Sequence, residues 1–279
     1  MPGRPAARTG EGGTVDPPMA RALPPPAGRA DDAAMTDTTT TIALVTGANK
    51  GIGKETARQL AQQGLTVWLG ARDESRGRAA EAELQGDGLD ARFVELDVTD
   101  AASIAAAAKV VDAEHGRLDV LVNNAGINGP GFDVPPSLVP VDGLQEVFAT
   151  NLFGVVAATN ALLPLLRRSA AGRIVNLSSS LGSLALAKTP GSQQSEVTLL
   201  AYNASKSALN MATVLLAREL EGSTVKVNAV CPGYCATDLN GHSGHLTPAE
   251  GARVVVQAAG LPADGPSGTF FDLDGPLPW

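Results

Sequence analysis

Tyr202 and Lys206 are the side chains of this sequence best suited to move a proton. They stand four positions apart, so on a helix they share one face. A free phenol has a pKa near 10, and an ammonium group one turn away favours the phenolate and lowers that pKa. The spacing alone is weak evidence, because such pairs are common on solvated helix faces. The Tyr202–Lys206 pair becomes stronger evidence because it follows Ser179, which in turn follows a strand-like run over residues 173–177.

A second set of residues is suited to bind phosphate. The stretch Thr46-Gly47-Ala48-Asn49-Lys50-Gly51-Ile52-Gly53 follows an apolar run, 42–45, and precedes residues 54–63, where apolar residues recur at helical spacing. A helix start has free N–H groups and the positive end of the helix dipole. Gly47, Gly51 and Gly53 remove the side chains that would block a pyrophosphate there. The alternative is a structural turn, but three glycines exceed what a turn needs.

The tip of the next strand, residues 66–70, indicates which dinucleotide would bind. It ends in Ala71-Arg72-Asp73, where a dinucleotide-binding fold meets the adenosine ribose. An acidic residue at position 71 would bind a 2′-hydroxyl and repel a 2′-phosphate, but alanine stands there. Arg72 and Lys50 supply two cations, which favours NADPH over NADH. Two alternatives stay open, namely that Arg72 is a solvated loop charge and that Asp73 caps the following helix.

Four further motifs follow in chain order. They are Asp97-Val98, Asn123-Asn124-Ala125-Gly126, Thr150-Asn151-Leu152-Phe153-Gly154, and Pro232-Gly233 with Thr237. Together with the glycine stretch, whose spacing is G-x-x-x-G-x-G, and with Ser179, Tyr202 and Lys206, they resemble the short-chain dehydrogenase/reductase family. The sequence TGANKGIG is especially similar to the carbonyl reductases of that family. The resemblance covers about residues 42–279.

The resemblance implies a role for each motif. Tyr202 would donate a proton to the carbonyl oxygen after hydride transfer, Ser179 would hold that oxygen, and Lys206 would also bind the nicotinamide ribose. Asn151, whose alternative reading is a surface polar residue, would anchor a water that relays protons through Lys206. The catalytic residues expected on this basis are Asn151, Ser179, Tyr202 and Lys206, and the substrate contacts are Ser179, Tyr202 and Tyr234. The expected NADPH/NADP+ contacts are Gly47, Asn49, Lys50, Gly51, Ile52, Gly53, Arg72, Asp97, Val98, Asn124, Ala125, Gly126, Tyr202, Lys206, Pro232, Gly233 and Thr237.

These residues need a scaffold of alternating strands and helices, which the chain provides. Seven strand-like runs alternate with helical segments, and this predicts a single-domain α/β fold with a doubly wound, parallel, seven-stranded Rossmann-like sheet. A long helix is expected over residues 141–168. Asn123 and Asn124 are expected to bond loop carbonyls at the sheet edge. The family implies the strand order 3-2-1-4-5-6-7, with the cofactor between strands 1 and 4.

Composition narrows the class of protein. The chain has 279 residues with 21 Lys+Arg against 29 Asp+Glu, so nothing favours nucleic acid or an anionic membrane as a partner. No apolar run of membrane-spanning length is expected. Two cysteines in this length, Cys231 and Cys235, suggest a reducing compartment and predict a cytoplasmic location. Asp238, His242 and His245 lack a fourth ligand and a helical register, so no metal is expected.

Residues 1–34 differ from the rest of the chain. They include seven Pro and five Gly, a composition typical of disorder. We therefore expect a disordered extension over 1–34 and a catalytic domain over 35–279, and the sequence leaves open whether translation starts at Met1 or Met35.

The predicted function is reduction of an aldehyde, ketone or quinone with NADPH, or the reverse oxidation of an alcohol. Two alternatives remain at this point: a non-catalytic NADPH-binding regulatory protein of the same fold, and a nucleotide-sugar epimerase or dehydratase. The substrate itself is not predicted, because loops 127–140, 181–200 and 234–247 build its pocket and loops vary freely. Monomer and homo-oligomer both stay open.

Overall fold

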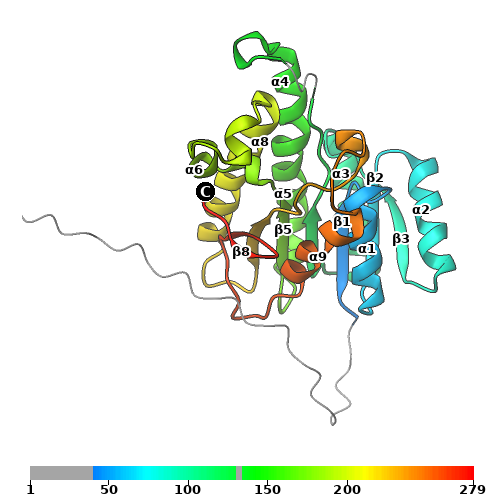
Figure 1. Ribbon diagram of the computed structural model, residues 1–279. Coiled ribbons are helices and arrows are strands. Elements are labelled where there is room, and N and C mark those ends of the chain that lie inside the picture. The colour runs from blue at the N-terminus through cyan, green and yellow to red at the C-terminus, as the bar shows by residue number, and fades with distance from the viewer. Residues whose placement is uncertain (1–39, 130–133) are drawn as a thin grey trace, which may run out of the picture. The chain divides into compact units, whose positions relative to one another are not determined.

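The computed structural model describes residues 40–129 and 134–279 and contains one sheet with helices on both faces (Figure 1). The expected extension over residues 1–34 and the boundary at Met35 lie outside the described residues. The sheet order is β3-β2-β1-β4-β5-β6-β7-β8. Its strands are β1 (Ile42–Thr46), β2 (Thr66–Ala71), β3 (Ala91–Glu95), β4 (Val120–Asn123), β5 (Arg173–Leu177), β6 (Lys226–Val230), β7 (Phe270–Asp272) and β8 (Gly275–Pro276).

The number of strands differs from the expectation. The first seven strands are parallel and lie in the expected order, whereas β8 is antiparallel to β7, with Phe271 opposite Pro276. The seven-stranded prediction is therefore corrected to eight strands. A strand of two residues, one of them proline, carries no periodicity that a sequence could reveal.

The strand sequences explain why the sheet is covered on both faces. Every residue of β1, β2, β4 and β5 is buried, and continuous apolar runs of this kind are typical of parallel sheets between two helical layers. One layer holds α1 (Gly51–Gln62), α2 (Glu74–Gly86) and α9 (Pro248–Ala259), and the other holds α3 (Ala101–His115), α5 (Val155–Leu166) and α8 (Leu200–Glu219). Because α1 and α5 leave neighbouring strands β1 and β4 toward opposite layers, the carboxyl ends of these strands form the switch point where ligands bind in such sheets.

The expected helix over 141–168 is one run with an irregular centre. It consists of α4 (Val141–Phe148), a π-helical turn over Ala149–Gly154, and α5. The run Val141–Leu166 is long and apolar enough to cross a membrane by length and composition, which the sequence analysis did not expect. In this fold α5 packs against β4, β5 and α3, and Leu162, Leu165 and Leu166 belong to the main hydrophobic core.

Three short helical segments lie between Ser179 and the start of α8. They are a 3-10 turn over Ser180–Gly182, α6 (Leu184–Ala187) and α7 (Gln193–Glu196). The chain end runs beside this segment, since the Ala185 amide donates to the Trp279 carbonyl. The loop expected to shape the substrate pocket is thus locally ordered by turns and by the C-terminal residues.

Candidate active site

The glycine loop joins β1 to α1 and packs tightly on the end of β4. Gly47 has a φ of +65°, and a Cβ on Gly53 would lie 2.4 Å from Nδ2 of Asn124. That Nδ2 donates hydrogen bonds to the carbonyls of Thr46 and Gly47, at 2.7 and 3.1 Å. Asn124 therefore fixes the loop as expected, and the small residues leave the loop surface bare.

Asn123 has a different role from the one expected. Its Nδ2 donates to Oδ1 of Asn176 at 2.8 Å and to Oγ1 of Thr159 at 3.1 Å, and all three residues are buried. These contacts join β4 to β5 and α5 beneath the site. The expectation that Asn123 bonds loop carbonyls is wrong, because strand alternation turns it into the helical layer while Asn124 faces the loop.

The start of α1 fits a dinucleotide pyrophosphate. Its N-cap residue, Lys50, makes no side-chain capping hydrogen bond, and the first turn contains no acidic residue. The first N–H groups of a helix have no partner within the helix and attract anions. An uncapped helix start behind a bare glycine loop is the arrangement that a phosphate group would complete.

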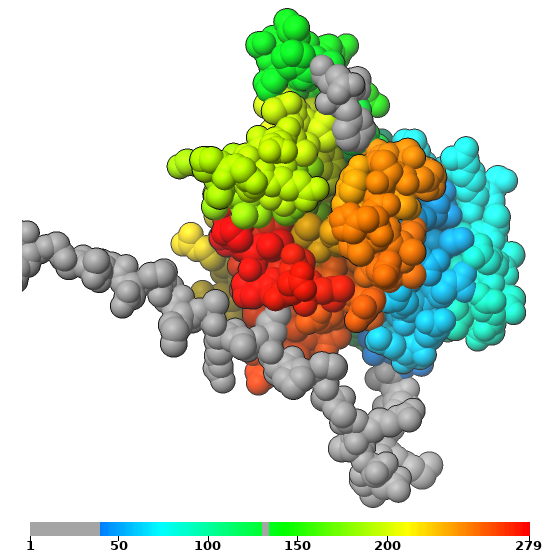
Figure 2. Space-filling model, viewed as in Figure 1, coloured from blue at the N-terminus to red at the C-terminus, as the bar shows by residue number. Residues whose placement is uncertain are grey.

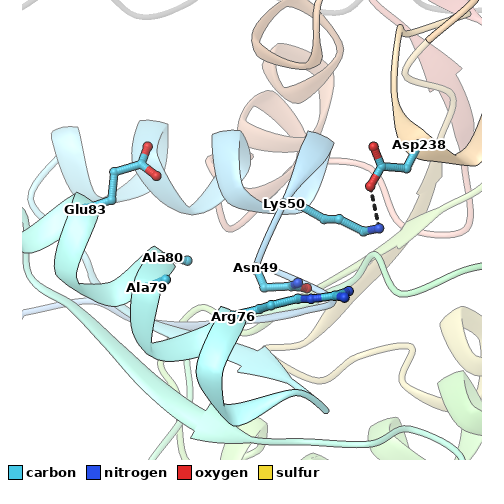
Figure 3. Close-up of a pocket in the computed structure, with 7 residues that line it drawn as sticks. All are labelled: Asn49, Lys50, Arg76, Ala79, Ala80, Glu83 and Asp238. Carbon is cyan, nitrogen blue, oxygen red and sulfur yellow. Dashed lines mark hydrogen bonds and ion pairs between the residues drawn. The ribbon is translucent and has the colours of Figure 1, made fainter. Parts of the chain in front are cut away.

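Beside the glycine loop lies a cavity of about 400 Å³ whose lining includes two cationic side chains (Figure 3). The side chains of Lys50 and Arg76 extend into the same region beside Asn49, and Asp238 reaches toward Lys50 from the facing segment. The lining residues are Asn49, Lys50, Arg76, Ala79, Ala80, Glu83 and Asp238. Arg76, in the first turn of α2, is a candidate that the sequence analysis missed.

Arg72 lies outside the residues that line this cavity. The pKa of the Asp97 carboxyl is lowered, chiefly by its hydrogen bonds with Thr99 and to a smaller extent by the charge of Arg72. The capping alternative for Asp73 is confirmed, because its Oδ1 accepts a hydrogen bond of 2.9 Å from the Arg76 amide. That cap fixes the first turn of α2 and with it the backbone of Arg76.

Ser179, Tyr202 and Lys206 come together at the carboxyl ends of β5 and β6. The Ser179 side chain lies close enough to the Tyr202 hydroxyl to affect the pKa of that phenol. The Lys206 Nζ lies 5.5 Å from the centre of the Tyr202 ring and donates to the carbonyl of Leu177 at 2.6 Å. The three side chains expected to perform the chemistry therefore converge in space.

The pKa values of this group differ from the expectation. Burial raises the pKa of Tyr202 to about 12, helped by the charge that Cys231 carries when it is ionised and opposed by the nearby Ser179 side chain. Burial lowers the pKa of Lys206 to about 8, and Cys231 opposes that shift. The expected lowering of the Tyr202 pKa by Lys206 is absent here, because the ammonium faces the ring and the Leu177 carbonyl.

Asn151 lies in the π-helical turn and is fully buried, so its reading as a surface residue is wrong. Its side chain accepts from the Ile127 amide at 2.9 Å and donates to the Ile127 carbonyl at 2.8 Å. Its Nδ2 also lies 3.0 Å from the hydroxyl of Ser205, which donates to the Tyr202 carbonyl at 2.8 Å. A Cβ on Gly126 would lie 3.3 Å from Oδ1 of Asn151 and 3.8 Å from Nζ of Lys206, so the end of β4 belongs to the same cluster.

The segment 234–247 covers the glycine loop from the other side. The Thr237 methyl lies 3.6 Å from the Cβ position of Gly51. Tyr234 is half-exposed and its hydroxyl lies 2.6 Å from that of Ser243. Figure 2 shows the orange surface of this segment and of α9 against the blue surface of α1. Pro232, Gly233 and Thr237 thus lead from the end of β6 toward the start of α1.

The cysteines and histidines of this region have ordinary partners. Cys231 and Cys235 are free and buried, and Sγ of Cys231 accepts a hydrogen bond from the Ser180 amide. His242 pairs with Asp238, while the His245 ring faces Tyr234. Within residues 40–129 and 134–279, no three His, Cys, Asp or Glu side chains gather as a metal site would require.

Comparisons with known proteins agree with this geometry. Residues 41–246 match the family described as short chain dehydrogenase. "Short-chain dehydrogenase/reductase 1" of Saponaria officinalis is 39% identical, over 82% of this chain and 93% of the relative. "Carbonyl reductase [NADPH] 1" of Bos taurus is 35% identical, over 85% of this chain and 98% of the relative. The solved structure of NADPH-bound carbonyl reductase from chicken fatty liver is 28% identical, with a TM-score of 0.75 over 86% of this chain and 99% of that chain.

Proposed function

This chain belongs to the short-chain dehydrogenase family, and on that premise we propose that it is an NADPH-dependent reductase of aldehydes, ketones or quinones. The observation that carries the proposal is the convergence of Ser179, Tyr202 and Lys206 beside a bare glycine loop. The same residues catalyse the reverse oxidation of an alcohol. The relative from Bos taurus and the chicken fatty liver structure, both named as NADPH carbonyl reductases, support this choice of substrate class and cofactor.

Residues from both ends of the chain would hold the cofactor. The uncapped start of α1 binds the pyrophosphate, and Lys50 with Arg76 binds the 2′-phosphate that distinguishes NADPH from NADH. Asn124, Ala125 and Gly126 let the nicotinamide ribose approach the end of β4, and Thr237 holds the carboxamide. When bound, the reduced nicotinamide supplies hydride to the carbonyl carbon.

Tyr202 is the proposed proton donor. With a pKa of about 12 it keeps its proton at neutral pH, and an alkoxide oxygen is basic enough to take that proton. Ser179 donates a hydrogen bond from Oγ to the same substrate oxygen. This bond positions the substrate oxygen beside the Tyr202 hydroxyl. After the transfer, the phenolate that Tyr202 becomes regains a proton by way of the neighbouring Lys206.

Asn151 and Lys206 complete the proposed route for protons. The pKa of about 8 for Lys206 lies near the working pH, where a group exchanges protons readily. We assign to Asn151 the anchoring of a relay water behind Lys206. Its side chain is already bonded to Ile127 and Ser205, which keeps the π-helical turn in place beside α8.

We also propose a cellular location and a class of partner for the enzyme. A net charge of −8 and two free cysteines support a cytoplasmic enzyme acting on small molecules, without nucleic acid or membrane as partner. The enzyme acts as a monomer or as a homo-oligomer.

The direct test is oxidation of NADPH by a panel of aldehydes, ketones and quinones, followed at the nicotinamide absorbance. We expect turnover with at least one class and a higher kcat/KM with NADPH than with NADH. Reactions without substrate serve as controls. No turnover with any panel member would overturn the carbonyl reductase assignment, and a preference for NADH would overturn the cofactor assignment.

A further inference from the structure

Asp238 and Lys50 form a contact between two distant parts of the chain. Oδ2 of Asp238 lies 2.5 Å from Nζ of Lys50, and the residues are 188 positions apart in sequence. Oδ1 of the same carboxylate pairs with Nε2 of His242 at 2.8 Å. The two residues of this contact belong to the lining of the cavity that Lys50 and Arg76 share (Figure 3).

Other carboxylates near this cavity have other partners. Glu83 pairs with Lys54 and Arg58 of α1, and Asp73 pairs with Arg76 within the first turn of α2. Asp238 is therefore the carboxylate that holds Lys50, and it comes from the segment 234–247. A phosphate monoester carries a charge of about −1.5 to −2 at neutral pH, so it competes with the single charge of Asp238 for this cation.

The backbone contacts around Asp238 indicate which neighbouring residues would move if its side chain lost Lys50 as a partner. Asp238 begins a 3-10 turn, Asp238–Asn240, directly after Thr237. His242 has a φ of +62°, which is uncommon for residues other than glycine. Asn240 closes the turn with bonds to the Thr237 amide and the Cys235 carbonyl. The residue with the carboxylate at the adenosine end is thus the direct sequence neighbour of Thr237, the proposed contact at the nicotinamide end.

We propose that Asp238 is a cofactor-selectivity residue. Its carboxylate pairs with Lys50 until a 2′-phosphate replaces the carboxylate as the partner of that lysine. Loss of the Asp238–Lys50 contact then releases the segment 234–247. The proposal rests on the NADPH dependence proposed above. NADH lacks the phosphate, so it leaves the Asp238–Lys50 contact in place. The carboxylate lowers the affinity for NADPH. It also couples binding of the 2′-phosphate to a change in the segment that carries Tyr234 and Thr237.

The first test uses the unmodified full chain with adenosine 2′,5′-bisphosphate and adenosine 5′-monophosphate, neither of which reaches the nicotinamide end. Hydrogen exchange is measured in peptides from residues 234–247. We expect the bisphosphate, but not the monophosphate, to speed exchange in this segment. Binding of the bisphosphate without such a change would overturn the release step while leaving the proposed NADPH dependence intact. Failure of the bisphosphate to bind would overturn both.

The second test compares Asp238→Asn with Asp264→Asn, an exposed aspartate before β7 that makes no ion pair within the described residues. Breaking an exposed ion pair changes affinity by up to about fivefold, and removing a like charge beside the phosphate adds to this. Asp238→Asn should therefore bind NADPH at least about threefold more tightly, with NADH affinity unchanged and no exchange response to the bisphosphate. Asp264→Asn should match the parent protein. Unchanged or weaker NADPH binding in Asp238→Asn would overturn the selectivity role.

Discussion

The ammonium of Lys206 donates a hydrogen bond of 2.6 Å to the carbonyl oxygen of Leu177, the last residue of β5. This bond holds a buried lysine on the face of the Tyr202 ring, 5.5 Å from its centre. A carbonyl stabilises the ammonium less than a carboxylate would, so burial dominates and the pKa falls to about 8. The site therefore contains a lysine that titrates just above neutral pH.

The affinity for NADPH should depend on this titration. Lys206 is charged below its pKa of about 8 and neutral above it, so its bond to the ribose hydroxyls weakens as pH rises from 7 to 9.5. Replacing a charge-assisted hydrogen bond by one from a neutral amine costs about 1 kcal/mol, which corresponds to a loss of affinity of about fivefold. Fluorescence titration of NADPH across this pH range measures the effect. Lys206→Met should bind more weakly and lack the decline, and the same decline in that variant would exclude Lys206 as its source.

Tyr202→Phe should separate chemistry from binding. The change removes one hydroxyl and little volume, so the fold and the NADPH affinity should be preserved. Proton delivery should fail, and general acids typically contribute about 10²–10⁴-fold to turnover. Carbonyl reduction and NADPH fluorescence are measured on the same preparation. Reduction at the parent rate would show that another group donates the proton.

Arg76→Ala should weaken NADPH far more than NADH. A charged hydrogen bond to phosphate contributes about 1.5–3 kcal/mol, so the dissociation constant for NADPH should rise about 10- to 100-fold. Arg72→Ala should also weaken NADPH more than NADH, but by less, because Arg72 lies outside the cavity lining. Arg78→Ala is the matched control on α2, since Arg78 pairs with Glu81 and lies over the Phe93 ring. Equal losses for both cofactors in Arg76→Ala would remove this residue from the phosphate site.

Removal of residues 1–34 should leave the enzyme unchanged. Their composition offers little apolar surface for a core. The melting temperature and the turnover of a chain starting at Met35 are compared with those of the full chain. A marked drop in either quantity would show that the extension contributes to the fold or the site.

The parts of the site that sequence could predict are those encoded locally. The glycine stretch, the Ser179 strand end and the Tyr202–Lys206 spacing each define a short element, and parallel strands bring their carboxyl ends to one edge. The resemblance to the family then predicts the order of the strands in the sheet. Eight strands in place of seven is the one error of topology, and it concerns two residues.

The parts that could not be predicted depend on contacts between distant segments. Asn123 and Asn124 are neighbours with the same side chain, and only their alternation across the end of β4 separates a core contact from a loop contact. Arg76 reaches the cavity because Asp73 caps α2 and sets the helical phase. The Asp238–Lys50 pair joins residues from opposite ends of the fold, for which no local pattern exists.

The eighth strand has a consequence for how copies of this chain can meet. It ends the sheet with Gly275 and Pro276, and proline offers no N–H group to a further strand. Short edge strands containing proline resist growth of a sheet from one molecule into the next. At this edge the fold is protected against chain-to-chain sheet extension, the first step of many aggregation routes, so any ordered association must use helical or loop surfaces there.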